Sequence, residues 1–389
     1  MRVLLLGLLV GCYSPKIQPG APCPDGVCPS ELVCTHAGTC ELTDSDAPPG
    51  GDAPLPADAP IALDGRPADA SGPPADAGPF CYGTGLVRIC FPTMPQGALQ
   101  LPATIDTGGS TCSGVSATYC VLAGKTIGVA GTVKATGPRP LVLVATDAIS
   151  IPAGAVLDVS AVGTSAGPGG RSACTSSAPT GDSGGAGGTF GSRGGDGGSG
   201  PLSGVATPAA AVTPITSLVG GCSGETGAGA MPGGGGGGGG AVYLIANQLQ
   251  ISGTIDASGE GGNGATVTAG GGGGGAGGFI GLDGASLALD GAAKLFANGG
   301  GGGEAAGSTA AGNGGGDPTA PDVRAQGGTG SSPNGGDGGD GAFAATGAEP
   351  GFDATSPTAG GGGGGGGVGA IRGYGVTITP GANISPPPT

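Results

Sequence analysis

Runs of consecutive glycines interrupt this chain and restrict what it can fold into. Three of them are Gly233–Gly240, Gly271–Gly275 and Gly361–Gly367, and glycine supplies 98 of the 389 residues. Glycine has no side chain to bury and loses more backbone entropy on folding than any other residue. A conventional side-chain core cannot include these runs, so they are either packed backbone against backbone or exposed as loops.

The remaining composition excludes one class of partner. The chain has no Trp, 5 Tyr and 7 Phe, and 27 acidic residues against 12 scattered basic ones give a net charge of -15. A phosphate backbone would be repelled by this charge, so we do not expect nucleic-acid binding. The acidity favours solubility and identifies no partner of its own.

The first residues have the pattern of a secretory signal. Arg2 is followed by the apolar run Val3–Val10, then by Gly11 and Cys12. An apolar stretch of this length is too short to cross a bilayer as a helix. We therefore predict a signal peptide at residues 1–11.

Leu9, Val10, Gly11 and Cys12 resemble the lipobox of bacterial lipoproteins. The resemblance implies cleavage before Cys12, acylation of that residue and attachment to a membrane through the acyl chains. Tyr13 lacks the negative charge typical of lipoproteins retained at the inner membrane, so the resemblance implies an outer-membrane or cell-surface location. The alternative is an ordinary signal peptide with an incidental cysteine.

The cysteines support export. Of 11 cysteines, removing Cys12 leaves an even number, as complete pairing in an oxidising compartment requires. We predict disulfides within three local groups: Cys23, Cys28, Cys34 and Cys40; Cys81, Cys90, Cys112 and Cys120; Cys174 and Cys222. Zinc in the first group, with His36 as a further ligand, is the alternative. Its spacing lacks paired two-residue knuckles, so we expect no metal and no cofactor.

Composition divides the chain into five parts. After the signal come the anchor cysteine and a small Cys-rich module at residues 12–42, then an Asp, Ala and Pro-rich disordered stalk at 43–79. Residues 80–121 carry four cysteines and predict a disulfide-braced cap. Residues 122–389 form the glycine-rich main domain.

An internal repeat in the main domain predicts its fold. The pattern of Ile127, Val129, Gly131 and Val133 returns at Leu249, and in longer form at Ile149, Leu287 and Val376 with Ile378. The two added residues preserve the side-chain parity, so the apolar positions remain on one face. Four of the units follow another apolar stretch, which gives the order strand, turn, strand, bend, strand. We predict an all-β fold, a parallel β-solenoid of about five coils.

The glycine-rich stretches between repeats are insertions, roughly Gly163–Gly240, Glu260–Gly278 and Gly299–Gly367, each ending just before a strand. They are expected to project from one corner of the solenoid. Two hypotheses remain open: extended polyproline-II-like segments bonded side by side, or flexible loops.

Catalysis by a β-solenoid enzyme would require clustered carboxylates, often with a basic residue. Stacking the repeats predicts two outward columns: Lys134, Asp158, Asp256, Phe296 and Ser385; Thr136, Ser160, Ser258 and Asn298. We interpret the pair Asp158 and Asp256 as ordinary surface residues, and the second column as a structural polar ladder. The tract Gly335–Gly341 is similar to calcium-binding Gly and Asp repeats but lacks their apolar position and does not recur. We predict no catalytic residue.

As a whole, the chain resembles glycine-rich bacterial surface lipoproteins, which have a cysteine module, a stalk and a glycine-rich β-domain. The resemblance implies a non-enzymatic structural or adhesive role, with envelope or matrix polysaccharide as the partner. The alternatives are a polysaccharide-active lyase or hydrolase, and a ligand or ice binder. An ice binder should present regular Thr pairs, which only Thr377 and Thr379 approach.

Overall fold

The computed structural model describes residues 32–34, 40–42, 79–201, 203–381 and 383–389, and these contain strands and no helix. They belong to two compact units, residues 1–72 and 73–389. In the first unit, β1 (Leu32–Cys34) pairs antiparallel with β2 (Cys40–Leu42), which places the backbone of Cys34 opposite that of Cys40. The predicted signal, Cys12, Cys23, Cys28, His36 and the stalk up to residue 78 lie outside the described residues.

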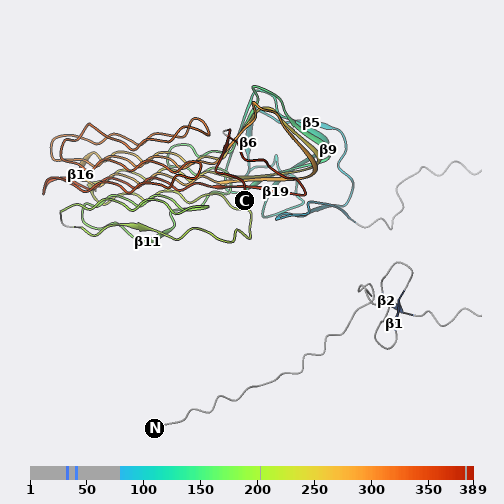
Figure 1. Ribbon diagram of the computed structural model, residues 1–389, viewed down its shortest axis with the longest axis horizontal. Coiled ribbons are helices and arrows are strands. Elements are labelled where there is room, and N and C mark those ends of the chain that lie inside the picture. The colour runs from blue at the N-terminus through green and yellow to red at the C-terminus, as the bar shows by residue number, and fades with distance from the viewer. Residues whose placement is uncertain (1–31, 35–39, 43–78, 202, 382) are drawn as a thin grey trace, which may run out of the picture. The chain divides into compact units, whose positions relative to one another are not determined.

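The second unit contains two parallel sheets of six strands each (Figure 1). The first sheet has the order β19 (Ala370–Tyr374), β17 (Phe279–Leu289), β14 (Ala241–Ile251), β9 (Leu141–Ile151), β7 (Cys120–Gly128) and β5 (Ala98–Gln100). The second has the order β20 (Ile384–Ser385), β18 (Lys294–Phe296), β15 (Thr254–Asp256), β10 (Val156–Asp158), β8 (Thr132–Thr136) and β6 (Thr104–Asp106). The chain alternates between the sheets, one strand in each at every level.

The main hydrophobic core is built from apolar side chains of both sheets. Ile149 is paired with Leu249, and Leu249 with Leu287, in the register that the repeat predicts. Val133 and Leu157 occupy equivalent positions of the second sheet and are fully buried. Alternation along each strand therefore directs one set of side chains into a common core.

The structure differs from the predicted repeat unit in three places. The first two strands of a unit are one continuous strand, as in β9, with a register shift between Ile245 and Gln248 where β14 pairs with it. A β-bulge absorbs the extra residue without a turn. Val376 and Ile378 lie outside any strand. Residues 98–106, predicted as part of a cap, instead supply the first strand of each sheet.

A second apolar cluster covers part of the outer face of the first sheet. Phe190 and Leu218 pack there with residues of the hairpin β3 (Phe80–Tyr82) and β4 (Ile89–Phe91). Asp283, 2% exposed, accepts hydrogen bonds from Thr84 N, Thr84 Oγ1, Gly85 N and the Tyr243 hydroxyl at 2.8–3.0 Å. These bonds satisfy a buried carboxylate and fasten the hairpin loop to the sheet.

The three insertions extend from the strands as glycine-rich segments that run side by side (Figure 1). In segment 270–278, successive N–H groups donate in rotation to segments 361–367, 257–263 and 222–228. Its carbonyls accept from segments 185–188, 233–239 and 300–303. This threefold rotation is the periodicity of polyproline II, which makes no hydrogen bonds within itself. The hypothesis of bonded extended segments is confirmed, and that of flexible loops is wrong.

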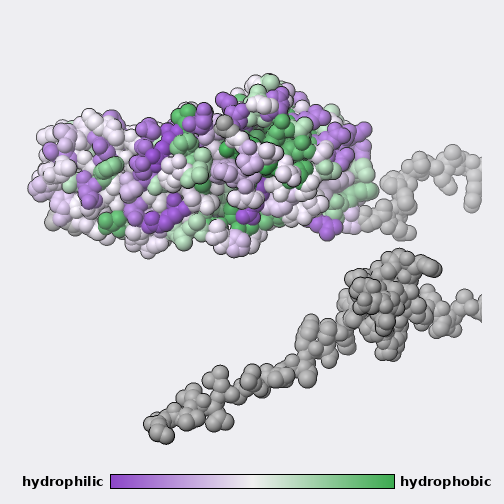
Figure 2. Space-filling view, in the orientation of Figure 1, coloured by the Kyte–Doolittle hydropathy of each residue, from purple (hydrophilic) through white to green (hydrophobic). Residues whose placement is uncertain are grey.

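The glycine-rich segments can pack against one another at hydrogen-bonding distance because glycine has no side chain. At every position of segment 271–275, an added Cβ would lie 1.9–2.1 Å from a carbonyl oxygen of a neighbouring segment. Two short antiparallel strand pairs lie among the same insertions: β13 (Gly229–Met231) with β16 (Val267–Ala269), and β11 (Thr175–Ser177) with β12 (Thr207–Pro208). Figure 2 shows hydrophobic residues to be most numerous toward the strand-containing end.

Three disulfides are present among the described residues: Cys81–Cys90, Cys112–Cys120 and Cys174–Cys222. Each closes within its predicted group. The first links β3 to β4, the second links the segment after β6 to the start of β7, and the third closes part of the longest insertion.

Candidate functional site

Charged side chains line up across neighbouring strands of the second sheet. Lys134 on β8 is paired with Asp158 on β10, and Asp158 with Asp256 on β15. Phe296 and then Ser385 follow on the next two levels. The predicted column therefore exists in the predicted order, and it brings a cation and two carboxylates onto adjacent strands.

The two aspartates terminate their strands in the same way. Asp158 Oδ1 accepts a hydrogen bond from Ser160 N, and Asp256 Oδ1 accepts one from Ser258 N, both at 2.9 Å. A carboxylate that bonds its own backbone two residues on forms an Asx-turn. The shared Asp-x-Ser sequence thus ends the strand in the same way at both levels, although backbone hydrogen bonds between the levels continue through Val159 and Ala257.

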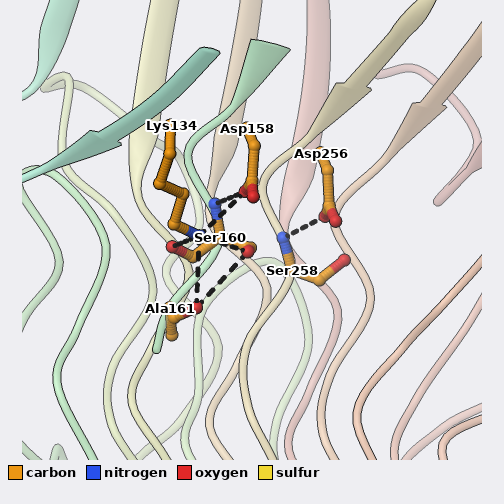
Figure 3. Close-up of polar contacts among 6 residues, drawn as sticks. All are labelled: Lys134, Asp158, Ser160, Ala161, Asp256 and Ser258. Atoms are coloured by element: carbon orange, nitrogen blue, oxygen red, sulfur yellow. Dashed lines mark hydrogen bonds and ion pairs between the residues drawn. The ribbon is translucent and has the colours of Figure 1, made fainter. Parts of the chain in front are cut away.

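Lys134 occupies the space beside Asp158 (Figure 3). Its Nζ donates to Asp158 Oδ1 at 2.9 Å, to Ser160 Oγ at 2.8 Å and to Ser160 O at 2.9 Å, with Ala161 O at 3.4 Å. The side chains of Lys134 and Asp158 are 23% and 22% exposed. The ammonium has three donors, and this arrangement satisfies them all on the protein itself.

Asp256 lies one level further on and is partly buried. Burial raises the pKa of Asp256 to about 6, while the hydrogen bonds from Ser258 oppose the shift and the charges of Asp158 and Lys134 act in opposite directions. General acid-base chemistry requires a group that can give up or take a proton near the working pH. Asp158 is held by Lys134, so Asp256 is the group in the column that is available to exchange a proton near neutral pH.

We expect Asp256→Asn to stabilise the protein at pH 7.5 by on the order of 2 kcal/mol, with little effect below pH 4. The raised pKa means that the unfolded chain loses this proton before the folded chain does. Stability from the neutral carboxyl is thus complete below about pH 4 and declines as pH rises through about 6. The measurement is urea unfolding of both proteins from pH 4 to 8, and an unchanged difference across this range would contradict the assignment. The matched variant Asp158→Asn should destabilise, because it removes the partner of Lys134.

The second predicted column is a polar ladder that glycine-rich segments partly cover. Asn298 N donates to Ser258 Oγ, the Ser385 hydroxyl donates to Asn298 Oδ1, and Asn298 Nδ2 donates to Ala320 O. Ser258, Asn298, Phe296 and Ser385 are buried, whereas Thr136 is exposed. The prediction that both columns face solvent is wrong for these four residues, because the insertions fold back over them.

Two carboxyl groups near this column were not among the residues predicted from the sequence. Burial, together with a hydrogen bond and the charge from Asp317, raises the pKa of Glu260. Asp317 Oδ1 also accepts from Gly261 N at 2.8 Å. These residues come from different insertions, and no pattern in the sequence connects them.

Glu304 is a fully buried carboxylate within a glycine-rich segment. It accepts hydrogen bonds from Asn313 N, Ser332 N, and Ser331 N and Oγ at 2.7–3.2 Å. Burial acts to raise its pKa, but these bonds together hold the pKa of Glu304 below its ordinary value. Glu304 therefore links two loops to the glycine-rich segments. Its position as the single charged residue in a run of glycines is the feature of the sequence that could have indicated this role.

The part of the chain that the structure describes holds no group of three His, Cys, Asp or Glu arranged to bind a metal ion. In the tract Gly335–Gly341, Asp340 instead forms an ion pair with Arg324 at 3.3 Å and accepts from Gly327 N. Within the same described residues, no helix is long and apolar enough to cross a membrane. Comparisons of the sequence with protein-family models, with curated proteins and with solved structures found no match.

Proposed function

We propose that the two parallel sheets and the glycine-rich segments form a parallel β-solenoid, each turn of which contributes one strand to each sheet. The support is the identical strand order of the sheets and the alternation of the chain between them. The hydrogen-bonded glycine-rich segments, whose neighbours run in both directions, then project from one corner of the turns.

We propose that this solenoid is the rigid body of a non-enzymatic surface lipoprotein with a structural or adhesive role. Export, anchoring through Cys12, a cell-surface or outer-membrane location and contact with envelope or matrix polysaccharide belong to this proposal. The observation that carries it is the bonded bundle of glycine-rich segments. A body held by backbone hydrogen bonds and disulfides offers an extended and rigid surface outside the cell.

The contacts of Lys134 argue against catalysis at the aspartate pair. A glycosidase needs one carboxylate free to attack or to activate water, and a second that gives up a proton. Asp158 is bonded to the Lys134 ammonium and to Ser160 N, so neither task is open to it without displacing them.

A second candidate function is supported by one observation, the raised pKa of Asp256 on the strand next to that of Asp158. This arrangement would suit a polysaccharide hydrolase in which Asp256 is the general acid. The candidate requires Lys134 to move when substrate binds.

The test is co-sedimentation of the purified full chain with insoluble envelope and matrix polysaccharides, with released reducing ends assayed in the same tubes. We expect binding without release, and equal binding by Asp256→Asn. Release that Asp256→Asn abolishes would establish the hydrolase instead. If neither binding nor release occurred, the adhesive role would be refuted and a passive structural coat would remain.

A further inference from the structure

We propose that a groove at the edge of the first sheet binds a fatty acid anion, with the carboxylate on Arg372 and the alkyl chain along apolar walls. The groove lies between residues 212–215 and residues 386–389. Binding of this ligand does not depend on the proposed surface role or on polysaccharide.

Three separate parts of the chain build the groove. Its floor is Val368–Ala370 together with Arg372, at and just before the edge strand β19. One wall is Val212–Ile215 from the first insertion, and the other is Pro386–Thr389. The groove has a volume of about 660 Å³, which lies within the usual range for small-molecule sites.

The walls of the groove are almost entirely apolar. They consist mainly of Val212, Pro214, Ile215, Pro386, Pro387 and Pro388. Ile215 and Ala370 belong to the second apolar cluster, so the groove is continuous with buried apolar side chains. Proline has no backbone N–H to donate, and the Thr389 hydroxyl already accepts a hydrogen bond from Arg372. An alkyl chain therefore fits these walls better than a sugar, which needs several donors and acceptors.

Among the residues that line the groove, Arg372 is the only charged one. Its Nε donates to Thr389 Oγ1 at 3.2 Å, and its Nη1 donates to Ile215 O at 3.1 Å. The guanidinium has five donors, so three remain outside these two bonds. In the described part of the chain, Arg193 and Arg324 are paired with carboxylates, whereas no carboxylate lies within ion-pair distance of Arg372.

Charge and geometry select a carboxylate as the partner of Arg372. The remaining donors include hydrogens on both terminal nitrogens, and such a fork matches the two oxygens of a carboxylate. Apolar surroundings strengthen an ion pair because they lower the local dielectric. The bonds to Ile215 and Thr389 already hold the guanidinium in place, so binding orders little of its side chain. The net charge of the chain is -15, so this local cation, and not the protein as a whole, attracts an anion.

Ligand-observed NMR titration of the full chain carrying Cys12→Ser tests the proposal. That change removes the proposed acylation, and with it the need for a detergent that would fill the groove. The probes are octanoate and octylammonium, which have the same chain length and opposite charges. We expect octanoate to bind with a dissociation constant of roughly 1 mM, and octylammonium to bind about tenfold more weakly. Non-specific attraction by the acidic chain would give the opposite order.

Two variants and a matched control locate the site. Arg372→Gln should weaken octanoate binding about tenfold and so remove the preference between the probes. Arg193→Gln removes an exposed guanidinium that is paired with Asp196, and should leave both affinities unchanged. Thr213 is exposed and lines the groove, so Thr213→Glu should weaken octanoate binding by a similar factor at an unchanged melting temperature. This second variant decides the question if Arg372→Gln fails to fold.

Four results would refute the proposal: no octanoate binding by the parent chain, equal binding of the two probes, octanoate binding that neither groove variant weakens, or equal weakening by Arg193→Gln. Co-sedimentation with polysaccharide is measured separately and does not involve these probes. Failure of the fatty acid site and failure of the adhesive role are therefore distinguishable.

Discussion

Gly275→Ala is expected to lower the free energy of unfolding by at least about 3 kcal/mol, although it adds a single methyl group. The new Cβ would lie 1.9 Å from Gly237 O and 2.5 Å from Gly237 C. Both are backbone atoms of a bonded neighbour, so no side chain can rotate away to relieve the contact. Segment 270–278 is surrounded by bonded segments, and moving it would stretch hydrogen bonds on several sides. Thermal unfolding followed by circular dichroism should show a midpoint lower by on the order of 5 °C.

Two adjacent glycines provide the control for this prediction. A Cβ on Gly315 would lie 2.3 Å from Gly301 O, whereas on Gly314 its nearest neighbour, Gly262 O, is 3.5 Å away. Gly315→Ala should therefore destabilise, and Gly314→Ala should be neutral or stabilise by about 0.5 kcal/mol through the entropy of the unfolded chain. Equal effects at the two positions would mean that the segments are not packed as described.

The register of the sheets was predictable from the sequence because it depends on side-chain parity. Ile149 and Leu249 occupy equivalent repeat positions, and burial of one face leaves a single register that keeps both inside. The column from Lys134 to Asp256 follows from the same parity. The continuity of β9 did not follow, because a bulge and a turn require similar residues between two apolar stretches.

The covering of the polar column could not be predicted, because it depends on contacts between insertions far apart in sequence. Ser385 accepts from Ala344 N, and Asn298 donates to Ala320 O. Both partners are backbone atoms, which any residue supplies. The sequence therefore carries no sign of these bonds.

The packing of the glycine segments is reflected in the sequence by a repeat of three residues. Arg193, Asp196 and Ser199 occur every third residue, separated by pairs of glycines, and each is at least partly exposed. A segment at the surface of the bundle has one outward position per turn of three residues. A segment with neighbours on all sides, such as 271–275, needs glycine at each position. The difference between Gly-Gly-X repeats and unbroken runs thus separates surface segments from interior ones.

Removing the Cys174–Cys222 disulfide by a double change to Ala is expected to cost about 4 kcal/mol, against about 2.5 kcal/mol for Cys112–Cys120. The sequence separations are 48 and 8, and the longer loop has more entropy to lose when it is closed. Cys222 and Cys120 are both fully buried, so the cavities left by the two changes should be similar and the loop length should decide the difference. The longer loop is also rich in glycine, whose unfolded entropy is the largest of any residue. Covalent closure is therefore most effective in the insertion that has few side chains to bury.

Urea unfolding of the two double variants under oxidising conditions measures both losses. Equal losses would show that the Cys174–Cys222 bond acts within the folded bundle rather than on the unfolded chain.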